Sequence, residues 1–491
     1  MKLERRSSFA PTPPASTLFS SMRPSLPFFI LSLSILAAPA ALGAAPVPPV
    51  RPNVVVLLTD DQGTLDANCY GSTDLKTPNI DRLSAGGVRF TQAYGHTVCC
   101  PSRAALFTGR HPQRGGVRNW TQGDRHGSDR QNLFMAPEEV TLAEALKSAG
   151  YRTALFGKWH LGAQVGHGPL DQGFDEHFGH LSGFIDNYRH FFLHGRGYHD
   201  LYDGNTEIFR RDEYYPDMMI DRAVRFIEAN KAAPFFMTVA FNLPHYPMQP
   251  TAKFKDGYAD LPMPRQAYAR MISSVDDHIG RVLDKLDATG LSDRTIVIFM
   301  SDNGHSTENN AGVSVDDHTS GYPRGHYYLA NGGGGNTGQW IGNKGTFLEG
   351  GIRVPAIIRY PAKIPAGQVR DQIVTIMDWF PTVLDLCGVA PQASAPKLDG
   401  RSMARLLSDP KAASAHEVLH FAWGRNWAVR RGDWKLISVF NPRTSTTRVS
   451  LHNLDEAKPE VKDHAEEKPE IVRELTALHE TWARSVEPKN V

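Results

Sequence analysis

The sequence predicts an α/β protein with a mostly parallel sheet sandwiched by helices. Several short runs are continuously apolar and rich in β-branched residues, which is typical of strands buried on both faces of a parallel sheet. Segments with apolar residues at helical spacing lie between these runs. This alternation indicates an α/β sheet, and such sheets bind ligands beyond the carboxyl ends of their strands.

Four of the predicted strands end directly in polar residues. We expect these strands at residues 53–59, 152–156, 235–241 and 295–300. The polar side chains that follow them are, in order, Asp60 and Asp61, then Lys158 and His160, then His245, and then Asp302 and Asn303. Because the carboxyl ends of parallel strands meet at one edge of a sheet, these side chains should converge on one crevice.

The helices between the strands have their own signals. Thr141 and Glu144 form a capping box, which predicts a helix that begins there and stops at Gly150. Residues 217–230 and 266–289 carry apolar side chains at helical spacing. Beyond residue 397 the pattern changes to short alternating strands at 420–423, 427–430 and 433–439, followed by an amphipathic helix at 469–485.

The composition excludes several classes of protein. The 491 residues include 53 Lys and Arg against 52 Asp and Glu, and 41% are hydrophobic, so a disordered, fibrous or multi-span membrane protein is excluded. A net charge of +1 provides no field that would attract nucleic acid. Four cysteines in so long a chain do not form a disulfide framework.

The first residues predict export. A basic stretch precedes an apolar run at residues 26–36, and small residues continue through Ala45, which is the pattern of a secretory signal over residues 1–45. The apolar run is too short to span a bilayer comfortably, so we expect no membrane anchor. The sequence therefore predicts a secreted or periplasmic protein.

The polar clusters suit a metal and an anionic substrate. Asp60, Asp61, Asp302 and Asn303 offer hard oxygen donors, which suit Ca²⁺ or Mg²⁺ rather than zinc. An Asp-Asp pair by itself is more often a helix cap or a turn. Two acidic clusters at the ends of two buried strands favour the metal, because uncompensated carboxylates would repel one another. The cationic and imidazole candidates for binding an anion and transferring a proton are Lys158, His160, His245 and Lys344.

A motif beside these clusters resembles a known family. Residues 99–103 read C-C-P-S-R, and the blocks at 105–110, 157–162, 344–355 and 378–385 occur in the same order as in the sulfatase family. The resemblance extends from about residue 53 to 453. It implies an alkaline phosphatase-like catalytic domain at 50–410 and a smaller C-terminal subdomain with an antiparallel sheet at 411–491.

The resemblance also implies a mechanism. Cys99, rather than Cys100, is oxidised to formylglycine by a formylglycine-generating maturation enzyme. The hydrated aldehyde attacks sulfur and later expels sulfate by re-forming the aldehyde. Modified Cys99 holds Ca²⁺ together with the oxygen donors of the two acidic clusters, and Arg103 stabilises the diol. Lys158, His245 and Lys344 contact the sulfate and the leaving oxygen. His160 is the base that takes a proton when the sulfated intermediate expels sulfate. Whether His245 or Lys344 protonates the leaving group stays open.

Two other functions are compatible with these residues. One is a phosphonate monoester or phosphodiester hydrolase of the same superfamily, and the other is a binding protein whose Cys99 is never oxidised.

Two loops, at residues 184–202 and 306–338, are rich in aromatic, histidine or glycine residues and should flank the crevice. We therefore expect a sulfated small molecule or glycan as substrate, with a sugar ring stacked on Tyr188, Phe191 or Tyr198.

Overall fold

The computed structural model describes residues 51–119, 134–194, 197–309, 319–326, 332–392 and 394–486. The predicted signal sequence at 1–45 lies outside these residues, as do residues 310–318 and 327–331 of the 306–338 loop. Val50–Val491 forms one compact unit. Within the described ranges, no helix is both long enough and apolar enough to cross a membrane.

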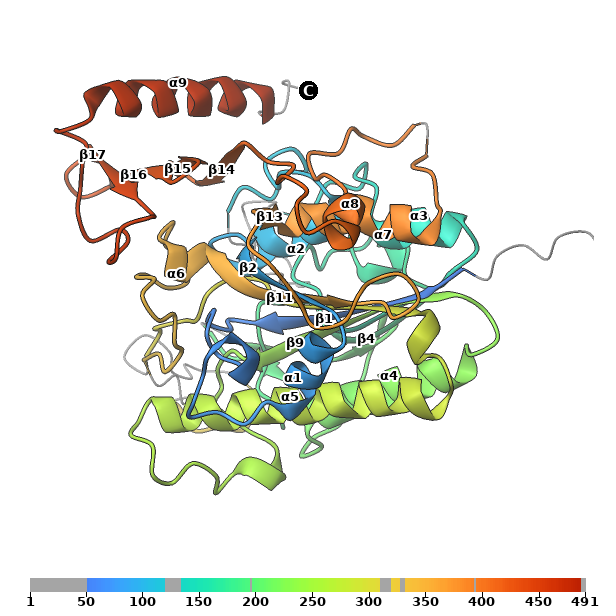
Figure 1. Ribbon diagram of the computed structural model, residues 1–491. Helices are drawn as coiled ribbons and strands as arrows, with labels where there is room; N and C mark the ends of the chain where they lie inside the picture. Colours follow the sequence, from blue (N-terminus) through green and yellow to red (C-terminus); the bar gives the residue numbers. More distant parts are fainter. Residues whose placement is uncertain are drawn as a thin grey trace, which may run out of the picture. The chain divides into compact units, whose positions relative to one another are not determined.

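The unit is built around an 11-stranded sheet (Figure 1). Five adjacent strands at its centre run parallel, in the order β10, β1, β9, β3 and β4. Their bounds are Thr295–Ser301, Asn53–Asp60, Phe235–Pro244, Arg152–Lys158 and Glu176–His180. The outer strands β11, β2, β12, β13, β7 and β8 are Arg353–Arg359, Val88–Tyr94, Gln368–Arg370, Val374–Thr375, Tyr202–Asp203 and Thr206–Glu207.

Helices cover both faces of this sheet. Alternate residues of β1 enter two different cores: Val54 and Val56 pack on one face, and Val55 and Leu57 pack on the other. The helices of the first face are α2, α3, α7 and α8, with bounds Cys99–Thr108, Leu142–Ser148, Trp379–Cys387 and Ala404–Ser408. Those of the second face are α1, α4 and α5, with bounds Pro78–Ala85, Tyr215–Ala229 and Arg265–Ala288.

The predicted fold class is confirmed. The sheet is mostly parallel and sandwiched by helices, and a separate antiparallel sheet follows it. The Thr141 side chain accepts a hydrogen bond from the Glu144 N–H at 3.1 Å, so the predicted capping box begins α3. Strands β2 and β4 were not predicted, because their sequences lack continuous apolar runs, and β11 was not predicted either.

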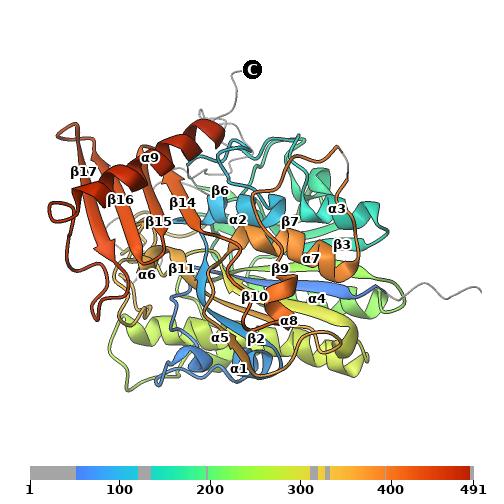
Figure 2. The same ribbon diagram turned by 45° about the horizontal axis from the view of Figure 1, so that its top comes forward.

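The C-terminal sheet contains β14 to β17, all antiparallel, at Val418–Trp423, Asn426–Arg431, Trp434–Asn441 and Thr446–Asn453. Helix α9, Pro469–Val486, lies across this sheet (Figure 2). The sheet's other face is apolar too, since Leu419, Phe421 and Ile437 pack against Tyr94 and Phe347. A domain boundary near residue 410 stays a prediction.

Candidate active site

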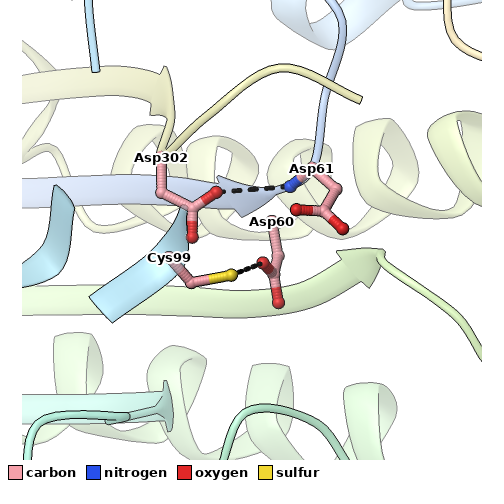
Figure 3. Close-up of side chains that lie close together, drawn as sticks. All are labelled: Asp60, Asp61, Cys99 and Asp302. Atoms are coloured by element: carbon pink, nitrogen blue, oxygen red, sulfur yellow. Dashed lines mark hydrogen bonds between the residues drawn. The ribbon is translucent and has the colours of Figure 1, made fainter. Parts of the chain in front are cut away.

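Four buried side chains from three elements meet at the carboxyl edge of the sheet. Asp60 ends β1 and Asp61 follows it, Asp302 follows β10, and Cys99 is the first residue of α2 (Figure 3). A ligand atom from each of them lies within 4.8 Å of the others. The convergence predicted from the strand ends therefore occurs.

The local backbone explains this placement. β1 pairs in parallel with both β9 and β10, so the three strands end side by side. Asp61 has φ of 65°, a left-handed conformation that Asp tolerates better than most residues. This turn lets the Asp61 backbone N–H donate to Asp302 Oδ1 at 3.3 Å, which holds the two strand ends together.

The two adjacent cysteines have different surroundings. Cys99 Sγ lies 3.4 Å from Asp60 Oδ1 and lines the open cleft above the cluster. Cys100 Sγ is 3.4 Å from the Asn119 carbonyl and belongs to the hydrophobic core behind α2. Cys69, Cys99 and Cys387 are free thiols. Burial and the neighbouring Asp60 raise the pKa of the Cys99 thiol, so unmodified Cys99 is a poor nucleophile.

Three cations surround the carboxylates. Lys158 Nζ donates to Asp60 Oδ2 at 2.7 Å, and Lys344 Nζ donates to Asp61 Oδ2 at 2.9 Å. The Arg103 guanidinium donates to Asp302 Oδ2 at 3.0 Å and to the Lys158 carbonyl at 2.9 Å. Lys158, Lys344 and Arg103 therefore stabilise the acidic cluster by donating hydrogen bonds to its carboxylates.

The pKa values of the three carboxylates shift in different directions. Burial acts to raise the pKa of Asp60, but Lys158 and the other cations hold it well below its usual value. Burial raises the pKa of Asp61 to about 6, against the opposing effect of Lys344. Burial and the charge of Asp60 raise the pKa of Asp302 to about 7. An additional cation would stabilise the ionised forms of both residues.

Asn303 completes the set of oxygen donors. Its Nδ2 donates to Asp61 Oδ1 at 2.7 Å, which leaves its Oδ1 as the acceptor. That Oδ1 is buried, and no described residue donates a hydrogen bond to it. A buried carbonyl oxygen without a donor is what a hard cation requires of its ligand. The residues therefore fit a hard divalent ion.

Cys99 of the cluster also borders a cleft of about 370 Å³. Cys99, His160, His245 and Lys344 line it. His245 Nδ1 lies 2.6 Å from the Tyr246 carbonyl, which fixes the tautomer that carries its proton on Nδ1. Its Nε2 is 3.6 Å from Asp61 Oδ2. Burial, together with Lys344, lowers the pKa of His245 to about 3, so the ring is neutral.

Comparison with known proteins identifies the family. The family model described as Sulfatase matches residues 52–389, and that of N-sulphoglucosamine sulphohydrolase, C-terminal, matches residues 338–482. The chain belongs to the sulfatase family. The predicted membership of the sulfatase family is confirmed.

Individual sulfatases are similar over most of this chain. N-acetylgalactosamine-6-sulfatase of Canis lupus familiaris is 34% identical over 73% of the chain, which spans just under two thirds, 66%, of that relative. Human steryl-sulfatase is 30% identical over 75% of the chain and 72% of its own length. Among solved structures, Ps i-CgsB has a TM-score of 0.76 at 28% identity, over 89% of this chain and 94% of its own. It has also been solved with k-i-k-neocarrahexaose.

The alternative of a phosphonate hydrolase has a weaker counterpart. A phosphonate monoester hydrolase of Agrobacterium radiobacter has a TM-score of 0.61 at 19% identity, over 90% of this chain and 96% of its own. At that identity the likeness concerns the fold alone.

All ten predicted site residues of this sulfatase lie at the cluster or line the cleft above it. The aromatic residues predicted to stack on a sugar do not line that cleft. Tyr198 stacks on Phe192 with ring centroids 5.1 Å apart, Phe191 packs on His199 at 5.3 Å, and Tyr188 packs on Tyr214 at 5.2 Å. The cleft is lined instead by Phe184, His194 and Glu308, which belong to the two loops predicted to flank it, and by Tyr246 and Trp423, which the sequence did not single out.

Proposed function

We propose that this chain hydrolyses sulfate esters of carbohydrates, with formylglycine derived from Cys99 as nucleophile and Ca²⁺ at the acidic cluster. The observation that carries the proposal is the joint position of Cys99, which lines the cleft, with three buried carboxylates and Asn303 beside it. The sulfated carbohydrate is supported by the oligosaccharide bound in the related Ps i-CgsB structure.

Asp60, Asp61, Asp302 and Asn303 would hold the cation, together with an oxygen of modified Cys99. Bound there, the ion would supply a Lewis acid and favour ionisation of the neighbouring hydroxyl. Formylglycine would supply a geminal diol in place of a thiol that burial keeps protonated. The amino end of α2 directs its dipole toward Cys99, which favours anionic oxygen at that position.

The chain's own cations then bind the substrate. Lys344 lines the cleft, and its Nζ donates a hydrogen bond to Asp61. The same ammonium group would donate to an incoming sulfate, which would then lie next to Asp61. Lys158 and Arg103 are fully buried beneath the cluster, so they fix the carboxylates and the charge of the cluster. His160 lines the same cleft and would take the proton when sulfate leaves.

The charge states of His245 and Lys344 favour Lys344 as the proton donor to the leaving group. His245 is neutral and its Nδ1 proton is committed to the Tyr246 carbonyl, so its Nε2 can only accept. Burial acts against the charge of Lys344, but Asp61 and its other anionic neighbours outweigh this and raise its pKa. We therefore propose Lys344 as the donor to the leaving oxygen and His245 Nε2 as a hydrogen-bond acceptor that orients the substrate.

Maturation and export belong to the same proposal. A formylglycine-generating enzyme would act on residues 99–103 before folding is complete, because Cys99 is only 1% exposed in the folded chain. Residues 1–45 would direct the chain to a secreted or periplasmic location. Residues 50–410 and 411–491 would act as catalytic domain and C-terminal subdomain. Amino-terminal sequencing of the exported protein tests the first of these boundaries.

The test of function combines mass spectrometry with kinetics. A peptide containing residues 99–103 should have the mass of formylglycine at Cys99, and an aryl sulfate should be hydrolysed much faster than the matching aryl phosphonate. Cys99→Ala should abolish turnover, and Cys100→Ala, the matched control in the core, should keep most of it. Turnover by Cys99→Ala, or faster hydrolysis of the phosphonate, would contradict the proposal.

A further inference from the structure

Trp423 separates two hollows on the surface of the described part of the chain. It is the last residue of β14, on the C-terminal sheet, and is half-buried. One side of the residue lines the catalytic cleft with Cys99 and Lys344. It also lines a second, more open groove of about 380 Å³ with Arg425 and Phe440. The two hollows therefore share Trp423 as a lining residue.

The ring has a fixed position. Trp423 pairs with Asn426 across a two-residue turn, and Gly424 at the first turn position has φ of 60°. On the catalytic side the ring faces Gly345, where an added Cβ would lie 3.7 Å from Trp423 Cζ3. Because Gly345 follows Lys344 and has no side chain, the indole lies beside the residue that would contact the leaving oxygen.

Arg425 gives the second groove a positive charge. Its guanidinium lies 3.4 Å from the centroid of the Phe440 ring, which holds it by a cation–π contact. Within the described ranges, no carboxylate forms an ion pair with it and no side chain or carbonyl accepts a hydrogen bond from it. A planar cation held by an aromatic ring keeps its donors available for a carboxylate or a sulfate.

We propose that Trp423 and Arg425 form a second saccharide subsite, which binds the sugar residue next to the sulfated one and contacts that residue's anionic group. An indole face suits the apolar face of a sugar ring, and the guanidinium suits its sulfate or carboxylate. The proposal rests on the proposed function, since it assigns the leaving group to an anionic oligosaccharide of at least two residues.

The experiment compares substrates of different length. Wild-type protein and Arg425→Met are assayed on sulfated galactose and N-acetylgalactosamine monosaccharides and on carrageenan, chondroitin sulfate and heparin tetrasaccharides. We expect kcat/KM for the preferred tetrasaccharide to fall about tenfold more than for any monosaccharide, which equals roughly 1.4 kcal/mol. Arg425→Lys should recover part of the loss. Arg443→Met, an exposed arginine on the β16–β17 turn, is the matched control and should change neither value.

Binding separates this proposal from the proposed function. In a Cys99→Ala chain, which cannot turn over, calorimetry should detect the tetrasaccharide, and Arg425→Met in that background should weaken binding by a similar factor. If the tetrasaccharide binds in a manner that depends on Arg425 but wild type does not hydrolyse it, the subsite is supported and the proposed function is refuted. Equal losses on monosaccharide and tetrasaccharide, or binding of no anionic tetrasaccharide in the panel, would overturn the subsite.

Discussion

Replacement of Lys435 by Met should destabilise the protein strongly, because Lys435 joins the C-terminal sheet to the catalytic part through a fully buried ion cluster. Its Nζ lies 2.9 Å from Glu349 Oε1 and 2.8 Å from Glu460 Oε1, and all three side chains are 0% exposed. Glu349 begins α6 (Glu349–Ile352), five residues after Lys344. The cluster therefore also supports the loop that carries Lys344.

The size of the loss in unfolding free energy follows from the hydrogen-bond donors that each carboxylate retains in Lys435→Met. Without Lys435, Glu349 Oε2 still accepts from Arg353 Nε at 2.6 Å and from the Tyr94 hydroxyl at 2.7 Å. Among the described residues, Glu460 keeps only the Glu349 backbone N–H as a donor, at 2.8 Å, and it loses its cation. One buried charge without a partner costs about 3–5 kcal/mol of unfolding free energy. The exposed pair of Lys462 with Glu467 supplies the control, since Lys462→Met should cost far less than Lys435→Met.

The effect should depend on pH with a definite sign. Burial raises the pKa of Glu460, and Lys435 opposes this shift, so the pKa rises further in the variant. A group with a raised folded-state pKa favours the folded state at low pH, and that contribution is lost as pH rises through the raised value. The stability gap between wild type and Lys435→Met should therefore be largest at neutral pH and narrow toward acidic pH.

Urea-induced unfolding followed by tryptophan fluorescence measures the gap. Glu460→Gln in the Lys435→Met background removes the unpaired charge and should recover much of the loss. The reasoning is refuted if Lys435→Met costs no more than Lys462→Met, or if the gap stays constant as the pH falls.

Three further outcomes follow from the site. Asp302→Ala should lose bound calcium, as measured by metal analysis after gel filtration, and full occupancy would remove Asp302 from the ligand set. Lys344→Ala should slow aryl sulfates with poor leaving groups far more than those with good ones, by about 10²-fold or more for the poorest, and an equal loss on all would refute proton donation. Tyr198→Ala should lower the unfolding free energy through its lost packing on Phe192, yet leave the ratio of saccharide to aryl sulfate turnover unchanged; a fall in that ratio would return Tyr198 to the substrate site.

Local sequence was sufficient for the central strands and the acidic cluster. The apolar runs before Asp60 and Asp302 predict strands buried on both faces, and parallel pairing then brings their carboxyl ends together. The capping box at Thr141 likewise fixes the start of α3 from four residues. The apolar runs and the Thr141–Glu144 spacing each indicate one local structure, a buried strand or a helix start, without information from the rest of the chain.

Tertiary structure decided what surrounds that cluster. Glycine at position 345 and tryptophan at position 423 are far apart in the sequence, and no local pattern relates them, yet the β14 hairpin places one against the other. Tyr188 and Tyr198 had the right chemistry for a sugar, but they lie in aromatic contacts with Tyr214 and Phe192. Burying aromatic surface against other rings lowers the free energy wherever the chain allows it, so composition alone does not determine which rings line a cleft. The sequence by itself determined the strands and the charges at their ends, because these depend on neighbours along the chain; the walls of the cleft depend on neighbours in space.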